Sequence, residues 1–161
     1  MDTTLAEGLT YGDILERYKK LEAVKDLTGA RFLYARSKNL MKLRSFYNRN
    51  SSDAKIPVTN GFREFQREII TLRNKHIIPA EEGKPASVNV QSDEYKEQAA
   101  ALEAKYKDVI ESRDLDIQVY RDLLKEPIPA SEMPEIYFCE NDGAELNQEQ
   151  MEAVWWFLKT E

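Results

Sequence analysis

Apolar residues near the start of the chain recur at steps of three and four, which places them on one face of a helix. The members of this face are Ile14, Tyr18, Leu21, Val24 and Leu27. Thr10 can accept a hydrogen bond from an amide of the first turn, and Asp13 completes an imperfect capping box. Gly29 tolerates the left-handed turn that closes many helices. We therefore predict a first helix over residues 10–28, preceded by a flexible N-terminus at residues 1–9.

A second helix is predicted over residues 30–47, a stretch that contains neither proline nor glycine. Within it, Leu33, Leu40 and Tyr47 recur every seven residues and indicate the buried face. The next stretch, residues 48–60, is rich in Asn, Asp and Ser, whose side chains hydrogen-bond their own backbone and favour turns. We predict that it forms a polar loop.

The cleanest apolar stripe of the chain begins at Asn60 and stops before Pro79, which cannot continue a helix. Its members are Phe62, Phe65, Ile69, Leu72 and His76. This spacing predicts a third helix. After a loop that contains glycine and proline, the alternation of Val88 and Val90 predicts a short strand.

No proline or glycine interrupts residues 93–125, and either Ser92 or Asp93 can cap a helix there. The apolar face of this helix would be formed by Tyr95, Ala99, Leu102, Tyr106 and Val109. The apolar residues within 114–120 also alternate as they would in a strand. We favour one long fourth helix, because few residues of that segment are β-branched.

Residues 136–139 predict a second short strand, and 141–143 (Asn-Asp-Gly) a turn after it. Asn147 can cap a final helix, with Gln150 three residues further on. The apolar face of that helix would carry Met151, Val154, Trp155 and Leu158. The pattern as a whole predicts a mainly α (α+β) fold of about five helices, the fourth long, with two short strands. We expect residues 10–161 to form a single domain.

Neither the composition nor the hydrophobic pattern indicates a membrane or secreted protein. Of its 161 residues, 42% are hydrophobic and 32% are charged, a balance typical of a globular domain. The first residues, MDTTLAE, lack the basic start and apolar run of a secretory signal. The longest apolar stretch, 153–158, is far shorter than the roughly 20 residues that cross a bilayer. We expect a protein that works in a cytoplasm, where its single cysteine stays reduced.

Residues that commonly carry catalysis are scarce. His76 is the single histidine and Cys139 the single cysteine, and they lie on separate predicted elements. We interpret His76 as a core or helix-end residue and Cys139 as a small buried hydrophobe. Neither a four-ligand zinc site nor a glycine-rich phosphate loop is present in the sequence. We therefore expect no enzymatic activity, no catalytic residue, no cofactor and no metal.

The net charge of −6 conceals an uneven distribution. Residues 1–78 contain 15 Lys and Arg against 9 Asp and Glu, whereas residues 79–161 contain 8 against 20. On the second helix, four basic residues fall within about 40° of one another at about 100° per residue. They are Arg31, Lys38, Lys42 and Arg49. Such a stripe could follow a phosphate backbone, face the acidic fourth helix or an acidic partner, or remain solvated.

Several large aromatic residues lie outside the predicted apolar faces. Tyr34 and Phe46 do so on the second helix, and Trp156 and Phe157 on the final one. Two interpretations are open. Either the domain covers these helices on a second side, or the aromatic residues anchor a partner, as such residues often do at interfaces.

The order of the elements carries a resemblance. A basic helix is followed by an aromatic helix, a short extended segment, a long acidic helix and a capped final helix. The segments concerned are 33–43 (LYARSKNLMKL), 64–69 (EFQREI), 87–90 (SVNV), 104–106 (AKY) and 144–151 (AELNQEQM). Over residues 27–158 the chain resembles small, uncharacterised helical proteins of tailed bacteriophages and prophages. This resemblance implies a phage origin and a non-enzymatic role, and supplies no catalytic residue.

Our leading hypothesis is a non-enzymatic phage accessory or structural protein that binds another protein, from the phage or the host, or itself as a homo-oligomer. It would be a virion or assembly component or an inhibitor of a host protein, located in the host cytoplasm or the virion. The alternative hypothesis is a nucleic-acid-binding protein that uses the basic helix at residues 30–49.

Overall fold

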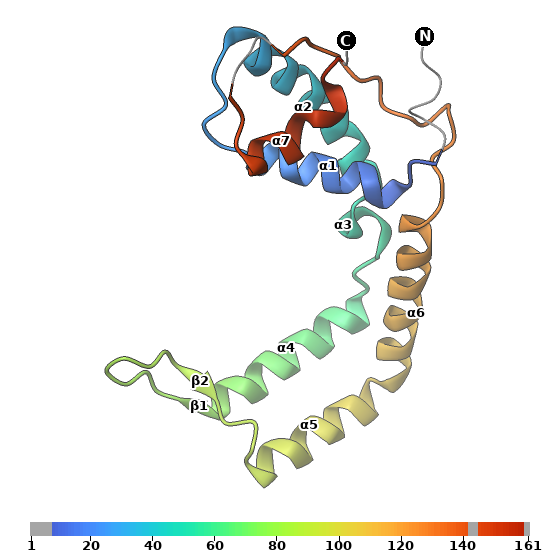
Figure 1. Ribbon diagram of the computed structural model, residues 1–161. Helices are drawn as coiled ribbons and strands as arrows, with labels where there is room; N and C mark the ends of the chain where they lie inside the picture. Colours follow the sequence, from blue (N-terminus) through green and yellow to red (C-terminus); the bar gives the residue numbers. More distant parts are fainter. Residues whose placement is uncertain (1–7, 142–144, 160–161) are drawn as a thin grey trace. The chain divides into compact units, whose positions relative to one another are not determined.

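The computed structural model describes residues 8–141 and 145–159, and they form two compact units (Figure 1). Unit 1 contains the chain up to Lys55 and again from Tyr120, and unit 2 contains Ile56–Val119. The expectation of a mainly helical chain with a small two-stranded element is confirmed, although the expected helix number holds only approximately. Residues 1–7 of the expected flexible N-terminus lie outside the described residues. The single domain over 10–161 stays a prediction, and each unit is described by itself.

Unit 1 holds the hydrophobic core. Its elements are α1 (Tyr11–Ala23), α2 (Ala30–Asn50), the single turn α3 (Ser52–Lys55), α7 (Gln148–Val154) and the 3₁₀ turn η2 (Trp155–Phe157). The largest fully buried hydrophobic side chains come from four of these elements. They are Ile14, Leu21, Phe32, Leu43, Phe46, Val154 and Phe157. Burying an aliphatic or aromatic side chain of this size contributes about 1.5–3 kcal/mol, so these contacts hold the helices together.

Side chains predicted to cap helices do so. The Thr10 hydroxyl accepts from the Asp13 amide while the Asp13 carboxylate accepts from the Thr10 amide, which completes a capping box. Asn147 and Gln150 form the same arrangement before α7. At the other end of α1, Arg36 reaches over from α2 and donates to the Leu21 and Glu22 carbonyls. A guanidinium in this position satisfies two carbonyls that the helix leaves free.

The first helix is shorter than predicted. It ends at Ala23, and Val24 is already extended. The chain then turns through Asp26, whose φ of 60° is left-handed, and Gln150 Nε2 lies 3.2 Å from both the Lys25 and the Asp26 carbonyl oxygens. These two hydrogen bonds replace those that a continued helix would have made.

The buried face of α2 differs from the one predicted. Leu33 is exposed, and Phe32, Ala35, Leu43 and Phe46 are buried together with Leu40. A seven-residue repeat drifts around a straight helix with 3.6 residues per turn. The observed burial follows steps of three and four instead, so the predicted face was wrong at Leu33, whereas Leu40 is buried and Tyr47 is partly buried against the core.

The predicted face of the final helix is also corrected. Met151 and Trp155 are exposed, while Ala153, Val154, Trp156 and Phe157 are buried. From Trp155 on, the chain changes from α-helix to 3₁₀ helix, which has only three residues per turn and redirects the side chains of Trp156 and Phe157. Trp156 Nε1 donates to the Ala153 carbonyl at 2.8 Å, so its burial leaves no polar atom unpaired.

The strand predicted at residues 136–139 does not form. Only Cys139 makes an isolated parallel bridge, with Leu158, through hydrogen bonds of 3.0 and 2.8 Å. Part of the predicted turn at residues 141–143 lies outside the described residues. The residues before Cys139 belong instead to an irregular segment whose partner is α2.

Unit 2 consists of helices and one hairpin (Figure 1). Its elements are α4 (Asn60–Lys75), β1 (Ile77–Ile78), β2 (Ser87–Val88), α5 (Asp93–Lys105) and the part of α6 (Lys107–Leu124) up to Val119. The predicted stripe of α4 faces α5, although of its members only Leu72 is fully buried. The strand predicted at Val88 exists, and its partner is Ile77–Ile78. These two residues were predicted to belong to the helix that stops before Pro79, but α4 already ends at Lys75.

The long fourth helix is broken at Tyr106, whose φ of −106° and ψ of 20° separate α5 from α6. Residues 114–120 are helical, as we favoured. The Ser92 hydroxyl caps α5 by accepting from the Tyr95 amide. The apolar face predicted across this helix is therefore divided between two helices with different directions, which Figure 1 shows.

Candidate functional site

Asn39 joins α2 to a distant part of unit 1. Its side chain is fully buried, and its Nδ2 donates to the Tyr137 carbonyl at 2.9 Å. The Tyr137 amide donates in return to Asn39 Oδ1 at 2.8 Å. A side-chain amide thus gives the backbone of Tyr137 the two hydrogen bonds that a neighbouring strand would give. This contact fixes an otherwise irregular stretch against the helix.

The segment formed by residues 131–140 lies along α2 in the opposite direction. Glu135 is 3.6 Å from the Lys42 Nζ, and Glu140 is 3.5 Å from an Arg31 guanidinium nitrogen. The contact between Asn39 and Tyr137 lies between these two ion pairs. Both ion pairs are exposed, so each adds little stability.

A cluster of exposed aromatic and basic residues results. The Tyr34 and Tyr137 rings pack edge to face with centroids 5.2 Å apart, and the Lys38 Nζ lies 5.4 Å from the Tyr34 centroid. Tyr34 remains 51% exposed and Tyr137 43% exposed. We call this cluster the α2 surface and define it by Arg31, Tyr34, Lys38, Tyr137, Phe138 and Lys159.

The α2 surface contains an open groove of about 580 Å³. Its lining includes the two tyrosines, Phe138, and the cations Arg31 and Lys159, with Glu140 as its one acid among the described residues. Aromatic side chains therefore provide its apolar contact area, and basic groups predominate at its edge.

A second hollow, also about 580 Å³, lies near the other end of α2. The basic residues Lys42, Arg49 and Lys55 line it together with Glu132. Glu132 accepts a hydrogen bond of 2.5 Å from the Tyr11 hydroxyl, and this bond, with burial and charge, raises the pKa of Tyr11 to about 12. The Tyr11 hydroxyl therefore stays protonated, and able to donate to Glu132, throughout the physiological pH range.

The predicted partner-binding residues divide into two groups. Arg31, Tyr34, Lys38, Lys42 and Arg49 lie at the surface of unit 1, and Arg49 donates to the Ser45 hydroxyl at 3.3 Å. Phe46, Trp156 and Phe157 are buried in the core. The interpretation of these three as partner anchors was wrong, because the fold itself covers them.

Sequence reasoning missed Tyr137, Phe138 and Lys159. Tyr137 and Phe138 were predicted to belong to a strand, and nothing in their spacing indicates that Asn39 hydrogen-bonds the Tyr137 backbone.

The exposed Trp155 was also missed, because it was assigned to the buried face of the final helix. Its ring lies 5.3 Å from the Arg17 guanidinium carbon, which also lies 5.5 Å from the Trp156 ring. Burial lowers the pKa of Arg17 from its ordinary value.

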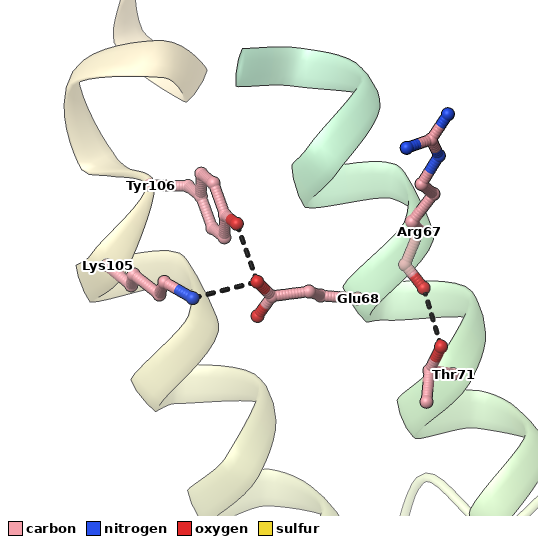
Figure 2. Close-up of polar contacts among 5 residues, drawn as sticks. All are labelled: Arg67, Glu68, Thr71, Lys105 and Tyr106. Carbon is pink, nitrogen blue, oxygen red and sulfur yellow. Dashed lines mark hydrogen bonds and ion pairs between the residues drawn. The ribbon is translucent and has the colours of Figure 1, made fainter. Parts of the chain in front are cut away.

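Unit 2 contains a close polar cluster around Glu68, shown in Figure 2. Glu68 of α4 accepts from the Lys105 ammonium at 2.7 Å and from the Tyr106 hydroxyl at 2.6 Å. The Lys105 hydrogen bond, followed by that of Tyr106, lowers the pKa of Glu68, and the same contacts raise the pKa of Lys105 and of Tyr106. Both hydrogen bonds go to Oε1 of Glu68 and come from residues at the break between α5 and α6, so we interpret the cluster as a structural link between α4 and that break.

The single histidine and cysteine show no catalytic arrangement. His76 ends α4, and its Nε2 lies 3.2 Å from Gln98 Oε1. Cys139 is buried in unit 1. Within residues 8–141 and 145–159, no group of three or more His, Cys, Asp or Glu side chains could hold a metal ion. In the same part of the chain, no helix is long and apolar enough to cross a membrane.

Comparison of the chain with protein-family models, with curated proteins and with solved structures found no match. The α2 surface is therefore interpreted from its own chemistry.

Proposed function

We propose that this protein is a non-enzymatic binding protein that recognises an acidic segment of another protein on the α2 surface. The observation that carries the proposal is the edge-to-face pair of Tyr34 and Tyr137, which stays about half exposed although it is held from beneath by Asn39. Exposed aromatic side chains are normal when scattered singly. In the α2 surface, two exposed aromatic rings lie together, and the backbone of one of them is held by Asn39.

Rigidity favours this surface as a binding site. A tyrosine held in place before binding loses little conformational freedom when a partner covers it. The Tyr34 ring is in contact with a second ring and a lysine, and the Tyr137 backbone is bound on both its N–H and C=O sides. Aromatic side chains that a partner buries on binding dominate the energetics of many interfaces.

Charge indicates the chemistry of the partner. Lys38 and Lys159 stand beside the aromatic rings, and Arg31 shares the groove with Glu140. Carboxylates of a partner segment could pair with these cations at the rim while its apolar side chains cover the rings. Complementary charges at a rim chiefly increase the rate of association and the choice of partner.

The resemblance to small helical proteins of tailed phages and prophages supports a biological setting for this proposal. In that setting the protein is an accessory or structural protein of a phage, either a virion or assembly component or an inhibitor of a host protein. It acts in the host cytoplasm or in the virion.

Affinity capture with matched variants tests the proposal. The immobilised protein is incubated with nuclease-treated lysate of phage-producing cells, and the bound proteins are compared with those retained by Y34S, K38E and K96E. Lys96 is exposed on α5, outside the α2 surface, so K96E changes the net charge as K38E does. We expect a captured protein with an acidic segment that Y34S and K38E lose and K96E retains.

Equal retention by all variants would exclude the α2 surface. A parallel capture uses lysate without nuclease. Capture that occurs only in this untreated lysate, together with binding of duplex DNA at low salt that K38E and K42E abolish, would favour the nucleic-acid alternative instead, because phosphate contacts strengthen as salt falls.

A further inference from the structure

Unit 2 has an apolar groove that its own helices leave open. The groove has a volume of about 470 Å³. Phe62 and Phe65 of α4 and Ile110 and Ile117 of α6 form its apolar lining. None of the four is fully buried. Covering an apolar surface of this kind with another apolar surface lowers the free energy, because both are removed from water.

The reason for the opening is the scarcity of core in this unit. Among its described residues, the buried hydrophobic side chains are Ile56, Leu72 and Tyr106. Two of them lie on or beside the contact between α4 and α5, and neither α5 nor α6 has a buried residue within its bounds. The apolar stripe on α6 therefore stays partly exposed beside α4.

Charged residues of both signs surround the groove. Lys107 and Glu111 are 71% and 64% exposed and lie one helical turn apart, with their charged atoms at 3.8 Å. Asp114 follows three residues later and also lines the groove. Glu103 and Arg113 complete the rim, with Arg113 stacked over the Phe62 ring at 3.9 Å. A uniformly acidic or uniformly basic partner would meet repulsion from half of this rim.

The order of these charges is self-complementary. When two copies of α6 lie antiparallel across a two-fold axis at Ile110, a residue meets those of the opposite copy that lie at a similar distance beyond the axis and on the same side of the helix. At about 100° per residue, Lys107, Glu111 and Asp114 lie on one side of Ile110, whereas Arg113 lies on the other side, over the Phe62 ring. Lys107 of one copy then lies between Glu111 and Asp114 of the other, and the same contacts form twice. Ile110 packs against Ile110 at the centre, and the phenylalanine rings of both grooves are covered.

We infer that the groove of unit 2 binds the same groove of a second copy of this chain, with the two α6 helices antiparallel. A contact centred on four apolar side chains per copy is smaller than a standard protein interface, so the dimer forms reversibly and its population rises with concentration.

Light scattering on the full chain tests this inference over micromolar to near-millimolar concentrations. Wild type is expected to change from monomer to dimer as concentration rises. K107E sets a carboxylate against Glu111 and Asp114 of the second copy and is expected to remain monomeric, and E111K is expected to associate more weakly than wild type. An equimolar mixture of K107E and E111K is expected to form a heterodimer, because the carboxylate that K107E introduces then faces the ammonium that E111K introduces, while Lys107 of the E111K chain faces Glu111 of the K107E chain.

The mixture separates association from a local effect on the helix. Both variants break the Lys107–Glu111 pair within their own chain, and mixing does not restore it. Glu16 and Lys20 form a matched exposed pair on α1 at 3.2 Å, so E16K and K20E should dimerise as wild type does. I110E should be monomeric while its circular dichroism stays helical.

Three results would each overturn the inference. They are wild type that stays monomeric over the whole concentration range, single variants that dimerise like wild type, and a mixture that fails to form the heterodimer. The inference does not depend on the proposed function, since K38E should lose the acidic partner and still dimerise.

Discussion

Asn39 and Tyr137 exchange two hydrogen bonds across a sequence separation of 98 residues, one from the Asn39 amide to the Tyr137 carbonyl and one in return. This pair determines where the segment 131–140 lies on α2. It also places the Tyr137 ring beside Tyr34, so the α2 surface depends on a residue that no partner could touch.

Replacing Asn39 should loosen this segment. Asn39→Leu removes both hydrogen bonds and leaves the Tyr137 N–H and C=O without partners, so we expect unfolding free energy to fall by about 2–4 kcal/mol. Urea denaturation measures the loss. Asn48 is exposed on the same helix, and Asn48→Leu should change stability by less than about 0.5 kcal/mol. Equal effects of the two substitutions would contradict the role assigned to Asn39.

Gly12 on α1 has no room for a side chain. A Cβ there would lie 2.9 Å from the Leu124 carbonyl oxygen, a backbone atom that cannot rotate away. We expect Gly12→Ala to cost about 1–3 kcal/mol in thermal or urea unfolding.

Gly61 is the matched control, since it is also the second residue of its helix. A Cβ at Gly61 would meet a methyl group of Val109 at 3.0 Å, which can turn aside. Alanine also favours a helix over glycine by roughly 1 kcal/mol. Gly61→Ala should therefore be much milder than Gly12→Ala, and the reverse order would show that the close approach of Leu124 is not limiting.

The Glu68 cluster should make unit 2 sensitive to acid. Because the Lys105 hydrogen bond, and after it that of Tyr106, lowers the folded-state pKa of Glu68, its stabilising effect is complete above the ordinary glutamate pKa. The effect is lost as pH falls through the lowered value. Thermal unfolding between neutral pH and pH 3 should show a steeper loss for wild type than for Glu68→Gln. Glu64→Gln, at an exposed position of α4, should follow wild type.

Tyr11 should titrate late. Its hydrogen bond to Glu132 is the main cause that raises its pKa to about 12 from an ordinary value of 10.0. The contact therefore stabilises the fold fully below pH 10 and ceases to do so as pH rises toward 12. Ultraviolet absorbance of the tyrosinate should show a late component that Tyr11→Phe removes and Glu132→Gln shifts to lower pH. A spectrum unchanged by Glu132→Gln would contradict this assignment.

Local features of the fold could be predicted from the sequence, and features made by distant contacts could not. The boxes at Thr10 and Asn147 involve residues three positions apart, so the sequence pattern is sufficient to reveal them. The break at Tyr106 has no glycine or proline to mark it, and it coincides with a hydrogen bond to Glu68, 38 residues away. The pairing of Ile77–Ile78 with Ser87–Val88 also could not be predicted, because it depends on the turn between the two segments and neither segment alone indicates its partner.

The candidate site could be predicted only in its basic half. Arg31, Lys38 and Lys42 share one side of a helix, and helical geometry alone brings them together. Tyr137 joins them because Asn39, a polar residue inside the core, binds its backbone. Trp156 and Phe157 were expected among the candidate surface residues but are buried, because a 3₁₀ turn redirects their side chains. The composition does not indicate such a turn.

Both tryptophans of the chain are adjacent in unit 1 and lie beside Arg17, whereas unit 2 contains none. Intrinsic fluorescence excited at the indole band is thus an optical label for one unit, while far-ultraviolet dichroism sums the helices of both. Melting curves recorded with these two signals would coincide for a molecule that unfolds in one step. Their separation along the temperature axis would measure how far each unit keeps its structure without the other.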